Sequence, residues 1–376
     1  MTTTQVKEGS HLNCKYELKE LGWNDALSNC FHPYLERGFY PGRISAEYRN
    51  RFKVWTEFGE VWAVISGKMR YAALERSDFP AVGDWVVLEY RAESMMDHED
   101  QDAVIQSILP RKSKFSRKVA GKTSEEQIVA TNIDTVFLVN ALNLDFNVRR
   151  IERYLTLAWE SGANPVIVLS KTDLCDDVQE KIGQVQNAAP GVDILPISCA
   201  TGDGISAVTA SIRQGQTIAL LGSSGVGKST LVNYLLGQTI QLTYEVRDKD
   251  SRGRHTTTAR ELFLLPQGGV LIDTPGMREI QLIGSGEGLN EAFEDITAYA
   301  RNCRFSDCQH EREPGCAVQK AITEGIISEE RYESFKKLQR ESRYISRKTN
   351  LHEQLEEKKK WKKINQQLKE HYQTKR

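Results

Sequence analysis

The sequence predicts a multidomain protein whose three parts belong to different fold classes. Short runs of alternating apolar and polar residues from about 36 to 110 are typical of antiparallel strands. From about residue 130, apolar runs alternate with helical segments, which indicates a parallel sheet covered by helices. After about residue 285 the pattern is helical, with a cluster of cysteines. We therefore expect domains at residues 1–112, 113–285 and 286–376.

The composition of the chain is that of an ordinary globular protein. With 39% hydrophobic and 27% charged residues, the 376-residue chain can bury a core. Its N-terminus lacks an apolar signal segment, and runs such as 218–221 are too short to cross a bilayer. We expect a cytoplasmic protein with no membrane partner, and nothing demands more than a monomer.

Charge is unevenly distributed although the net charge is only −1. Residues 111–118 are mostly basic, and the tail from Lys336 onward is rich in lysine and arginine, with the run KKKWKK at 358–363. Each segment could be a solvated charged face, the usual explanation of a charge run, or a contact for nucleic-acid phosphates.

The first predicted part is a small antiparallel barrel. Its strand-like segments are 43–58, 60–74 and 84–90, with glycines between them. An oligonucleotide-binding (OB) barrel of five strands is one candidate, but the pattern does not separate it from other small barrels.

The second predicted part contains five apolar strands and one clear early helix. The strands are expected at 135–139, 165–169, 193–197, 217–221 and 269–272, and the helix at 148–161. Parallel strands separated by helices place their carboxyl ends on one edge, where such sheets bind ligands.

A glycine-rich segment follows the strand at 217–221 and opens a helix, which fits the phosphate-loop pattern GxxxxGK[ST]. Its backbone N–H groups would surround phosphates, Lys228 would reach the β- and γ-phosphates, and the Ser229 hydroxyl would ligate Mg²⁺. The alternative is a chance glycine-rich turn. The predicted nucleotide-binding residues are Gly222, Ser223, Ser224, Gly225, Val226, Gly227, Lys228, Ser229 and Thr230.

A DTPG turn follows the strand at 269–272. Asp273 is then the expected outer partner of Mg²⁺, and the Gly276 N–H would register the presence of a γ-phosphate. The turn alone is weak evidence, and its spacing from the phosphate loop strengthens it.

Two further segments predict guanine as the base. Ser170, Lys171, Thr172 and Asp173 end a strand and resemble the Asn-Lys-x-Asp motif of GTPases, with Ser170 in place of asparagine. The two oxygens of Asp173 can accept hydrogen bonds from N–H groups that guanine has and adenine lacks. Ser198, Cys199 and Ala200 would form the backbone loop that contacts the guanine oxygen. Either segment by itself could be a surface turn.

The order of these motifs is the reverse of the usual one, because the base-recognition motif precedes the phosphate loop. A circular permutation explains this, since joined termini and a new exposed break preserve a sheet. The segment after Asp273 then leads directly into the C-terminal part, so the nucleotide state could move that part.

The cysteine cluster predicts a structural zinc site. Cys303, Cys308, His310 and Cys316 supply three thiolates and one imidazole, a closed tetrahedral set for one Zn²⁺. A disulfide is unexpected in a reducing compartment. The ion would hold a small loop that has no core of its own.

The permuted order, the segment GRHTTT at 253–258 and the trailing Cys/His cluster resemble the RsgA family of ribosome small-subunit-dependent GTPases. Segments 132–139, 145–147 and 150–155 add to the resemblance, which covers most of the chain. It implies an OB barrel, a permuted GTPase domain binding GTP or GDP and a zinc domain. It also implies contact with the small ribosomal subunit and its rRNA late in maturation, with hydrolysis stimulated by the subunit.

The catalytic residues are expected to be Lys228, His255 and Thr257. Met277 stands where many GTPases place a water-orienting glutamine, and a thioether cannot polarise water. In proteins like this one the histidine before the threonines is the suspected substitute, here His255, although it could equally contact RNA or solvent. Thr257 is the favoured threonine to close over Mg²⁺.

Two other functions remain open from the sequence. A P-loop ATPase or kinase acting on a small molecule would explain the phosphate loop but not residues 170–173. A non-catalytic RNA-binding protein would use the nucleotide only to stabilise its fold.

Overall fold

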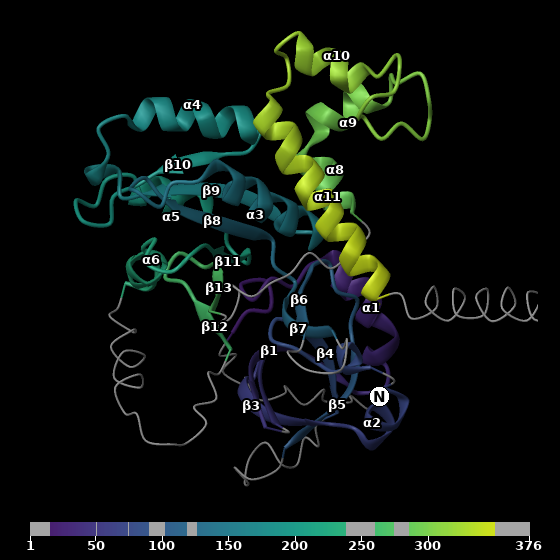
Figure 1. Ribbon diagram of the computed structural model, residues 1–376. Helices are drawn as coiled ribbons and strands as arrows, with labels where there is room; N and C mark the ends of the chain where they lie inside the picture. The colour runs from purple at the N-terminus through teal and green to yellow at the C-terminus, as the bar shows by residue number, and fades with distance from the viewer. Residues whose placement is uncertain are drawn as a thin grey trace, which may run out of the picture.

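The computed structural model describes residues 16–49, 51–73, 75–89, 102–118, 126–237, 260–273 and 286–349. Figure 1 shows a barrel at the bottom, an α/β layer above it and C-terminal helices at the top. A long last helix, α11 (Glu329–Thr349), runs past the α/β layer toward the barrel. None of the described helices is both long and apolar enough to cross a membrane.

The N-terminal part is a closed five-stranded barrel, as the sequence predicts. Strand β1 pairs with β2 and β4, β2 pairs with β3, and β5 closes the barrel between β3 and β4. The helix α1 (Asp25–Leu35) precedes the barrel. The barrel strands are β1 (Tyr40–Tyr48), β2 (Arg51–Thr56), β3 (Gly59–Ile65), β4 (Trp85–Glu89) and β5 (Ala103–Ile108).

One segment of the barrel departs from its predicted structure. Residues 67–72, which we expected to continue a strand, form the helix α2 (Gly67–Ala72). The Ser66 side chain starts this helix by accepting a hydrogen bond from the Met69 N–H at 3.1 Å. This N-cap outweighs the alternating pattern of the segment.

The basic segment 111–118 is largely held by internal contacts. The Arg111 guanidinium binds both oxygens of the fully buried Asp84 carboxylate, at 2.8 and 2.7 Å. Lys112 pairs with Asp134, and Phe115 is buried. Strand β6 (Lys114–Lys118) pairs with β7 (Glu126–Thr131) in a hairpin between the barrel and the α/β layer. The charges of Arg111 and Lys112 are therefore not simply solvated.

The central sheet has the strand order β10-β9-β8-β11-β13-β12 and is parallel except for its last strand, β12. All five strands predicted from the apolar runs are present, and β12 was not predicted. The strands are β8 (Thr135–Ala141), β9 (Asn164–Ser170), β10 (Ile194–Pro196), β11 (Thr217–Leu221), β12 (Glu261–Leu264) and β13 (Val270–Asp273).

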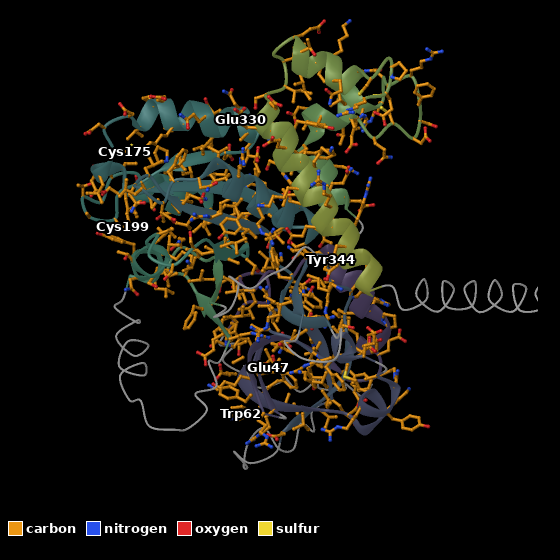
Figure 2. All side chains as sticks on the ribbon, in the orientation of Figure 1. Glu47, Trp62, Cys175, Cys199, Glu330 and Tyr344 are labelled. Atoms are coloured by element: carbon orange, nitrogen blue, oxygen red, sulfur yellow. The ribbon has the colours of Figure 1, made fainter. Side chains whose placement is uncertain are left out.

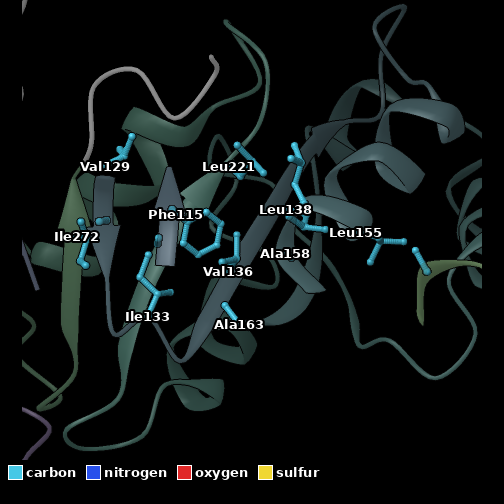
Figure 3. Close-up of a cluster of buried hydrophobic side chains, with 14 of the residues drawn as sticks. Phe115, Val129, Ile133, Val136, Leu138, Leu155, Ala158, Ala163, Leu221 and Ile272 are labelled. Atoms are coloured by element: carbon cyan, nitrogen blue, oxygen red, sulfur yellow. The ribbon is translucent and has the colours of Figure 1, made fainter. Parts of the chain in front are cut away.

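Helices cover both faces of this sheet. Successive residues of β8 point to opposite faces and therefore pack against different helices. Val136 and Leu138 belong to the same buried cluster as Leu155 of α3 (Figure 3), whereas Phe137 and Val139 pack in a second cluster with helices α5 and α6. These helices are α3 (Val148–Glu160), α4 (Val178–Ala188), α5 (Ile205–Ser211) and α6 (Lys228–Leu236).

The barrel joins the central sheet directly. Ala46 of β1 pairs with Glu261 of β12, so one hydrogen-bonded sheet runs through both parts. The buried Arg43 of β1 donates to the Thr217 hydroxyl at 2.7 Å. Burial lowers the pKa of Arg43 to about 10, and the nearby carboxylates of Asp134 and Asp84 oppose that shift.

The C-terminal part packs on α3 through a buried ionic network. Arg331 of α11 donates to Glu152 of α3 at 2.8 Å and to Asp295 of α9 at 2.6 and 2.7 Å. Burial raises the pKa of Glu152, and Arg331 opposes that rise. The helices before α11 are α8 (Glu287–Ala292), α9 (Glu294–Ala300) and α10 (Ala317–Thr323).

Candidate nucleotide site and metal centre

The phosphate loop, Gly222–Thr230, begins at the carboxyl end of β11 and runs into the first turn of α6. Its first glycine allows close packing, since a Cβ at Gly222 would lie 2.3 Å from the Val139 carbonyl oxygen of β8. Any larger residue would push the loop away from the sheet. The strand, loop and helix therefore have the arrangement that the sequence predicts.

The Lys228 side chain lies over the phosphate loop. Its Nζ donates to the carbonyl oxygens of Gly222 at 2.7 Å and Ser223 at 2.5 Å. Ser229 and Thr230 are exposed at the start of α6. An ammonium and two hydroxyls at a helix N-terminus favour an anion such as phosphate. Elsewhere in the loop Ser224 and Gly225 are exposed and Val226 is buried.

Ser170 ties the base-recognition segment to the phosphate loop. Its side chain is only 2% exposed, and its Oγ lies 2.6 Å from the Val226 carbonyl oxygen and 3.3 Å from that of Asn140. Ser170 stands where the Asn-Lys-x-Asp motif has asparagine, whose longer side chain could make a further hydrogen bond. In the structure the hydroxyl instead fixes the end of β9 against the phosphate loop.

Asp173 is held by the loop that follows β10. The Ser198 hydroxyl donates to Asp173 Oδ1 at 2.6 Å, and its own oxygen accepts the N–H groups of Ala200 and Thr201, both at 3.2 Å. Asp173 itself is exposed. The two predicted guanine segments are therefore one hydrogen-bonded unit.

The same unit is attached to the helix that follows the phosphate loop. The Tyr234 hydroxyl of α6 donates to the Cys199 carbonyl oxygen at 2.9 Å. Burial raises the pKa of the Cys199 thiol. Lys171 adopts a left-handed backbone conformation with φ 62°, which turns the chain sharply after β9. Figure 2 shows Cys199 at the end of the α/β layer away from α11.

The predicted switch residues are described only in part. Ile272 of β13 pairs with Ala219 of β11, so the backbone of Asp273 lies at the same sheet edge as the phosphate loop. The loops after β8, β9, β10, β11 and β13 thus converge on that edge. Three predicted site residues lie outside the described part of the chain: Gly276, His255 and Thr257.

Sequence reasoning missed an ion pair beside the phosphate loop. Arg150 binds Asp145 and also donates to the Ser223 hydroxyl at 2.5 Å. Both residues lie in segments of the family resemblance, but neither belongs to a nucleotide-binding motif, so the sequence did not predict their contact with Ser223. The parallel pairing of β8 with β11 brings Asp145 and Arg150 beside Ser223.

The Cys/His cluster is assembled as the sequence predicts. The ligand atoms of Cys303, Cys308, His310 and Cys316 all lie within 4.8 Å of one another. The Sγ atoms of Cys303 and Cys316 are 3.9 Å apart, and each is 3.5 Å from His310 Nδ1. A tetrahedron with zinc–sulfur bonds of about 2.3 Å has edges of about 3.8 Å, so the donor set fits Zn²⁺.

The loop that carries these ligands is braced by a carboxylate. Glu313 accepts hydrogen bonds from the N–H groups of Gln309, Glu311 and Arg312 at 2.9–3.0 Å. These backbone hydrogen bonds, that of Gln309 first, lower the pKa of Glu313 to about 2. The His310 carbonyl oxygen accepts from Gln319 Nε2 at 2.6 Å. The Tyr332 hydroxyl of α11 donates to the same oxygen at 2.5 Å. The ligands are therefore positioned by hydrogen bonds within the loop and by two from the helices that follow it.

Comparison with known proteins identifies relatives of the chain. A family model described as RsgA GTPase matches residues 108–283, and one described as ABC transporter matches residues 205–375. Both spans contain the phosphate loop. The small ribosomal subunit biogenesis GTPase RsgA of Opitutus terrae is 43% identical over 93% of this chain and 96% of its own length. The small ribosomal subunit biogenesis GTPase RsgA 2 of Lactiplantibacillus plantarum is 48% identical over 82% of this chain and 85% of its own length.

Two solved structures share the fold. YjeQ from Thermotoga maritima has a TM-score of 0.61 and 28% identity, over 81% of this chain and 98% of its own. YloQ, a circularly permuted GTPase, has a TM-score of 0.58 and 23% identity, over 81% and 95%. These likenesses confirm the predicted barrel and permuted α/β fold.

Proposed function

Since the chain belongs to the RsgA family and is a GTPase, we propose that it hydrolyses GTP on the small ribosomal subunit, late in the maturation of that subunit. The observation that supports this most is the position of the Asp173 carboxylate, which Ser198 holds at 2.6 Å beside the loop of Cys199. A small-molecule ATPase or kinase has no use for this arrangement.

Guanine would bind to the Asp173 carboxylate. The carboxylate would accept the ring N–H and the exocyclic amine of guanine, and the backbone of residues 198–200 is the proposed contact of the guanine oxygen. Adenine would leave the carboxylate unpaired, which costs more than the lost hydrogen bonds themselves. Ser198 keeps the carboxylate oriented before the base arrives, because its hydroxyl is itself held by Ala200 and Thr201.

The phosphates would lie along the phosphate loop. Lys228, whose ammonium donates to the Gly222 and Ser223 carbonyl oxygens, would bind the β- and γ-phosphates. Ser229 offers Mg²⁺ an oxygen ligand of the kind that ion prefers, with Thr257 and Asp273 as its further proposed partners. The bound ion would neutralise charge on the transferring phosphate.

Hydrolysis by the isolated protein should be slow. We propose that His255 positions the attacking water, with the Gly276 N–H sensing the γ-phosphate, and that the ribosomal subunit orders this segment. Arginine fingers supplied by a partner accelerate related reactions by about 10³–10⁵. Stimulation by the subunit is expected in the same range or below it.

The barrel offers a surface suited to rRNA. Two cations of β2 lie over the Trp62 ring of β3: the Arg51 guanidinium is 4.7 Å and the Lys53 ammonium 5.5 Å from the ring centroid. Tyr48 of β1 packs edge-on against Trp62, with their ring centroids 5.2 Å apart. Trp62 is labelled in Figure 2. Aromatic rings beside cations can stack on bases and contact phosphates. Residues 1–112 are therefore proposed as the main RNA-binding domain, with 113–285 and 286–376 as the GTPase and zinc domains.

The decisive experiment measures GTP hydrolysis by the wild type, His255→Ala and Asp173→Asn with and without purified small ribosomal subunits. We expect strong stimulation of the wild type, little with His255→Ala, and about 10²-fold weaker GTP binding by Asp173→Asn. Asp176→Asn, a nearby exposed carboxylate on the same loop, is the matched control.

Two results would contradict the proposal. If added subunits leave the rate of GTP hydrolysis unchanged, the proposal that the small ribosomal subunit is the partner is wrong. If ATP displaces bound GTP as well as an equal concentration of GTP does, Asp173 does not select guanine, and an ATPase or kinase is favoured.

A further inference from the structure

A side-chain clamp holds the second residue of the phosphate loop from outside the nucleotide-binding motifs. It consists of Asp145, Arg150 and Ser223. Arg150 lies in the first turn of α3, which Asn147 caps by accepting the Arg150 N–H at 3.1 Å. Since β8 and β11 are parallel neighbours, the chain after β8 passes beside the phosphate loop after β11.

The contacts of the clamp form a closed triangle. Arg150 binds Asp145 through two hydrogen bonds, Nη1 to Oδ2 at 2.6 Å and Nη2 to Oδ1 at 3.0 Å. Arg150 Nη1 also donates to Ser223 Oγ at 2.5 Å, and that hydroxyl donates to Asp145 Oδ2 at 3.1 Å. The hydrogen bond from Arg150, and then that from Ser223, lower the pKa of Asp145. All three groups are therefore paired with one another.

Ser223 contacts both the other two residues of the clamp and the phosphate-loop lysine, Lys228. The Ser223 carbonyl oxygen accepts from Lys228 Nζ at 2.5 Å, while its hydroxyl is held by Arg150 and Asp145. Ser223 is thus fixed on two sides, and the peptide that follows it can keep one orientation. A phosphate loop binds through such backbone N–H groups, and a loop that is ordered before binding loses less entropy on binding.

We propose that Arg150, oriented by Asp145, is a positioning residue for nucleotide binding that keeps the phosphate loop in its binding conformation through Ser223. The guanidinium is neutralised by a bidentate carboxylate, so it does not act as an arginine finger on the γ-phosphate. Its contribution is to the affinity for both GTP and GDP, because both use the same loop.

The test compares Arg150→Ala, Arg150→Lys and Ser223→Ala with Arg149→Ala as the matched control. Arg149 is the preceding residue of α3, and its pair with Glu333 is exposed and 3.8 Å long. Fluorescent GTP and GDP report the dissociation constants, and steady-state assays separate kcat from KM. Thermal unfolding checks that each variant is folded.

We expect Arg150→Ala to raise the dissociation constants for GTP and GDP about tenfold, the size expected for a lost charge-assisted hydrogen bond. The value of kcat at saturating GTP should stay within about twofold, and Arg149→Ala should match the wild type. Arg150→Lys should recover part of the affinity, since lysine keeps the charge but not the fork geometry. The double variant Arg150→Ala/Ser223→Ala should bind no more weakly than the weaker single variant.

Three results would overturn the proposal. One is unchanged nucleotide affinity in Arg150→Ala. Another is a fall in kcat with unchanged affinity, which would place Arg150 on the reacting phosphate. The third is full additivity of the two single variants. If Arg150→Ala does not fold, Ser223→Ala alone must still weaken GTP and GDP equally, because it removes only the clamped hydroxyl.

Discussion

The metal centre and the nucleotide site are built in opposite ways. The four metal ligands come from fourteen consecutive positions, 303–316, and hydrogen bonds within that loop, joined by those of Gln319 and Tyr332, position them. The nucleotide site draws on the ends of neighbouring parallel strands, and its groups meet only when the sheet forms. The first site needs little beyond its local sequence, whereas the second depends on the whole central sheet.

The difference predicts how each site fails. A metal ion that organises a loop carries much of the folding energy of that loop, so its loss is all or none. In the nucleotide site each hydrogen bond is one of several, so its loss gives a graded change in affinity.

The largest effect is expected from removal of zinc or from Cys308→Ser. The region of α9 and α10 should lose its ordered structure, because structural zinc in small domains contributes about 10–16 kcal/mol. Elemental analysis should find one zinc per chain in the wild type and none in the variant, and hydrogen exchange should rise in residues 293–323. GTP affinity should change less than about threefold, because no described hydrogen bond of residues 170–173 or 222–230 involves residues 301–316. A large loss of GTP affinity would show that the two sites are not independent.

A smaller effect is expected at the buried ionic network that joins the C-terminal helices α9 and α11 to α3. Arg331→Ala leaves Glu152, itself buried, without its partner and should lower the free energy of unfolding by about 3–5 kcal/mol. Arg149→Ala breaks an exposed pair between the same two helices and should cost less than about 1 kcal/mol. Urea denaturation measures both. Equal losses in the two variants would contradict the importance of burial.

The smallest effect is expected from Ser170→Ala. The variant loses the hydrogen bond to the Val226 carbonyl, at a cost of about 1 kcal/mol, so GTP should bind about fivefold more weakly. Ser161→Ala, whose hydroxyl bonds Ala158 at the far end of α3, is the control and should bind normally. Affinity equal to that of the wild type would show that Ser170 does not order the phosphate loop.

Much of the fold could be predicted because its signals are local. The buried runs that became β8, β9 and β11 are apolar over several consecutive residues, as expected of strands covered on both faces. The strand β12 and the helix α2 were missed. Both are short, and their structure depends on a neighbouring strand or a single cap rather than on periodicity.

The candidate site divides in the same way. The motifs around Lys228, Asp173 and the cysteine cluster were found because each needs particular residue types at fixed spacing. The contacts of Ser170 with Val226, and of Arg150 with Ser223, could not be found, because residues 56 and 73 positions apart in the chain carry no shared pattern.

The sequence by itself determined which groups can meet phosphate, guanine and zinc, because spacing and side-chain chemistry are properties of short segments. Only the tertiary structure decided how those segments hold one another. Parallel strand pairing places the loops after β8, β9 and β11 on one edge, and hydrogen bonds across that edge fix the Ser223, Val226 and Asp173 groups in place.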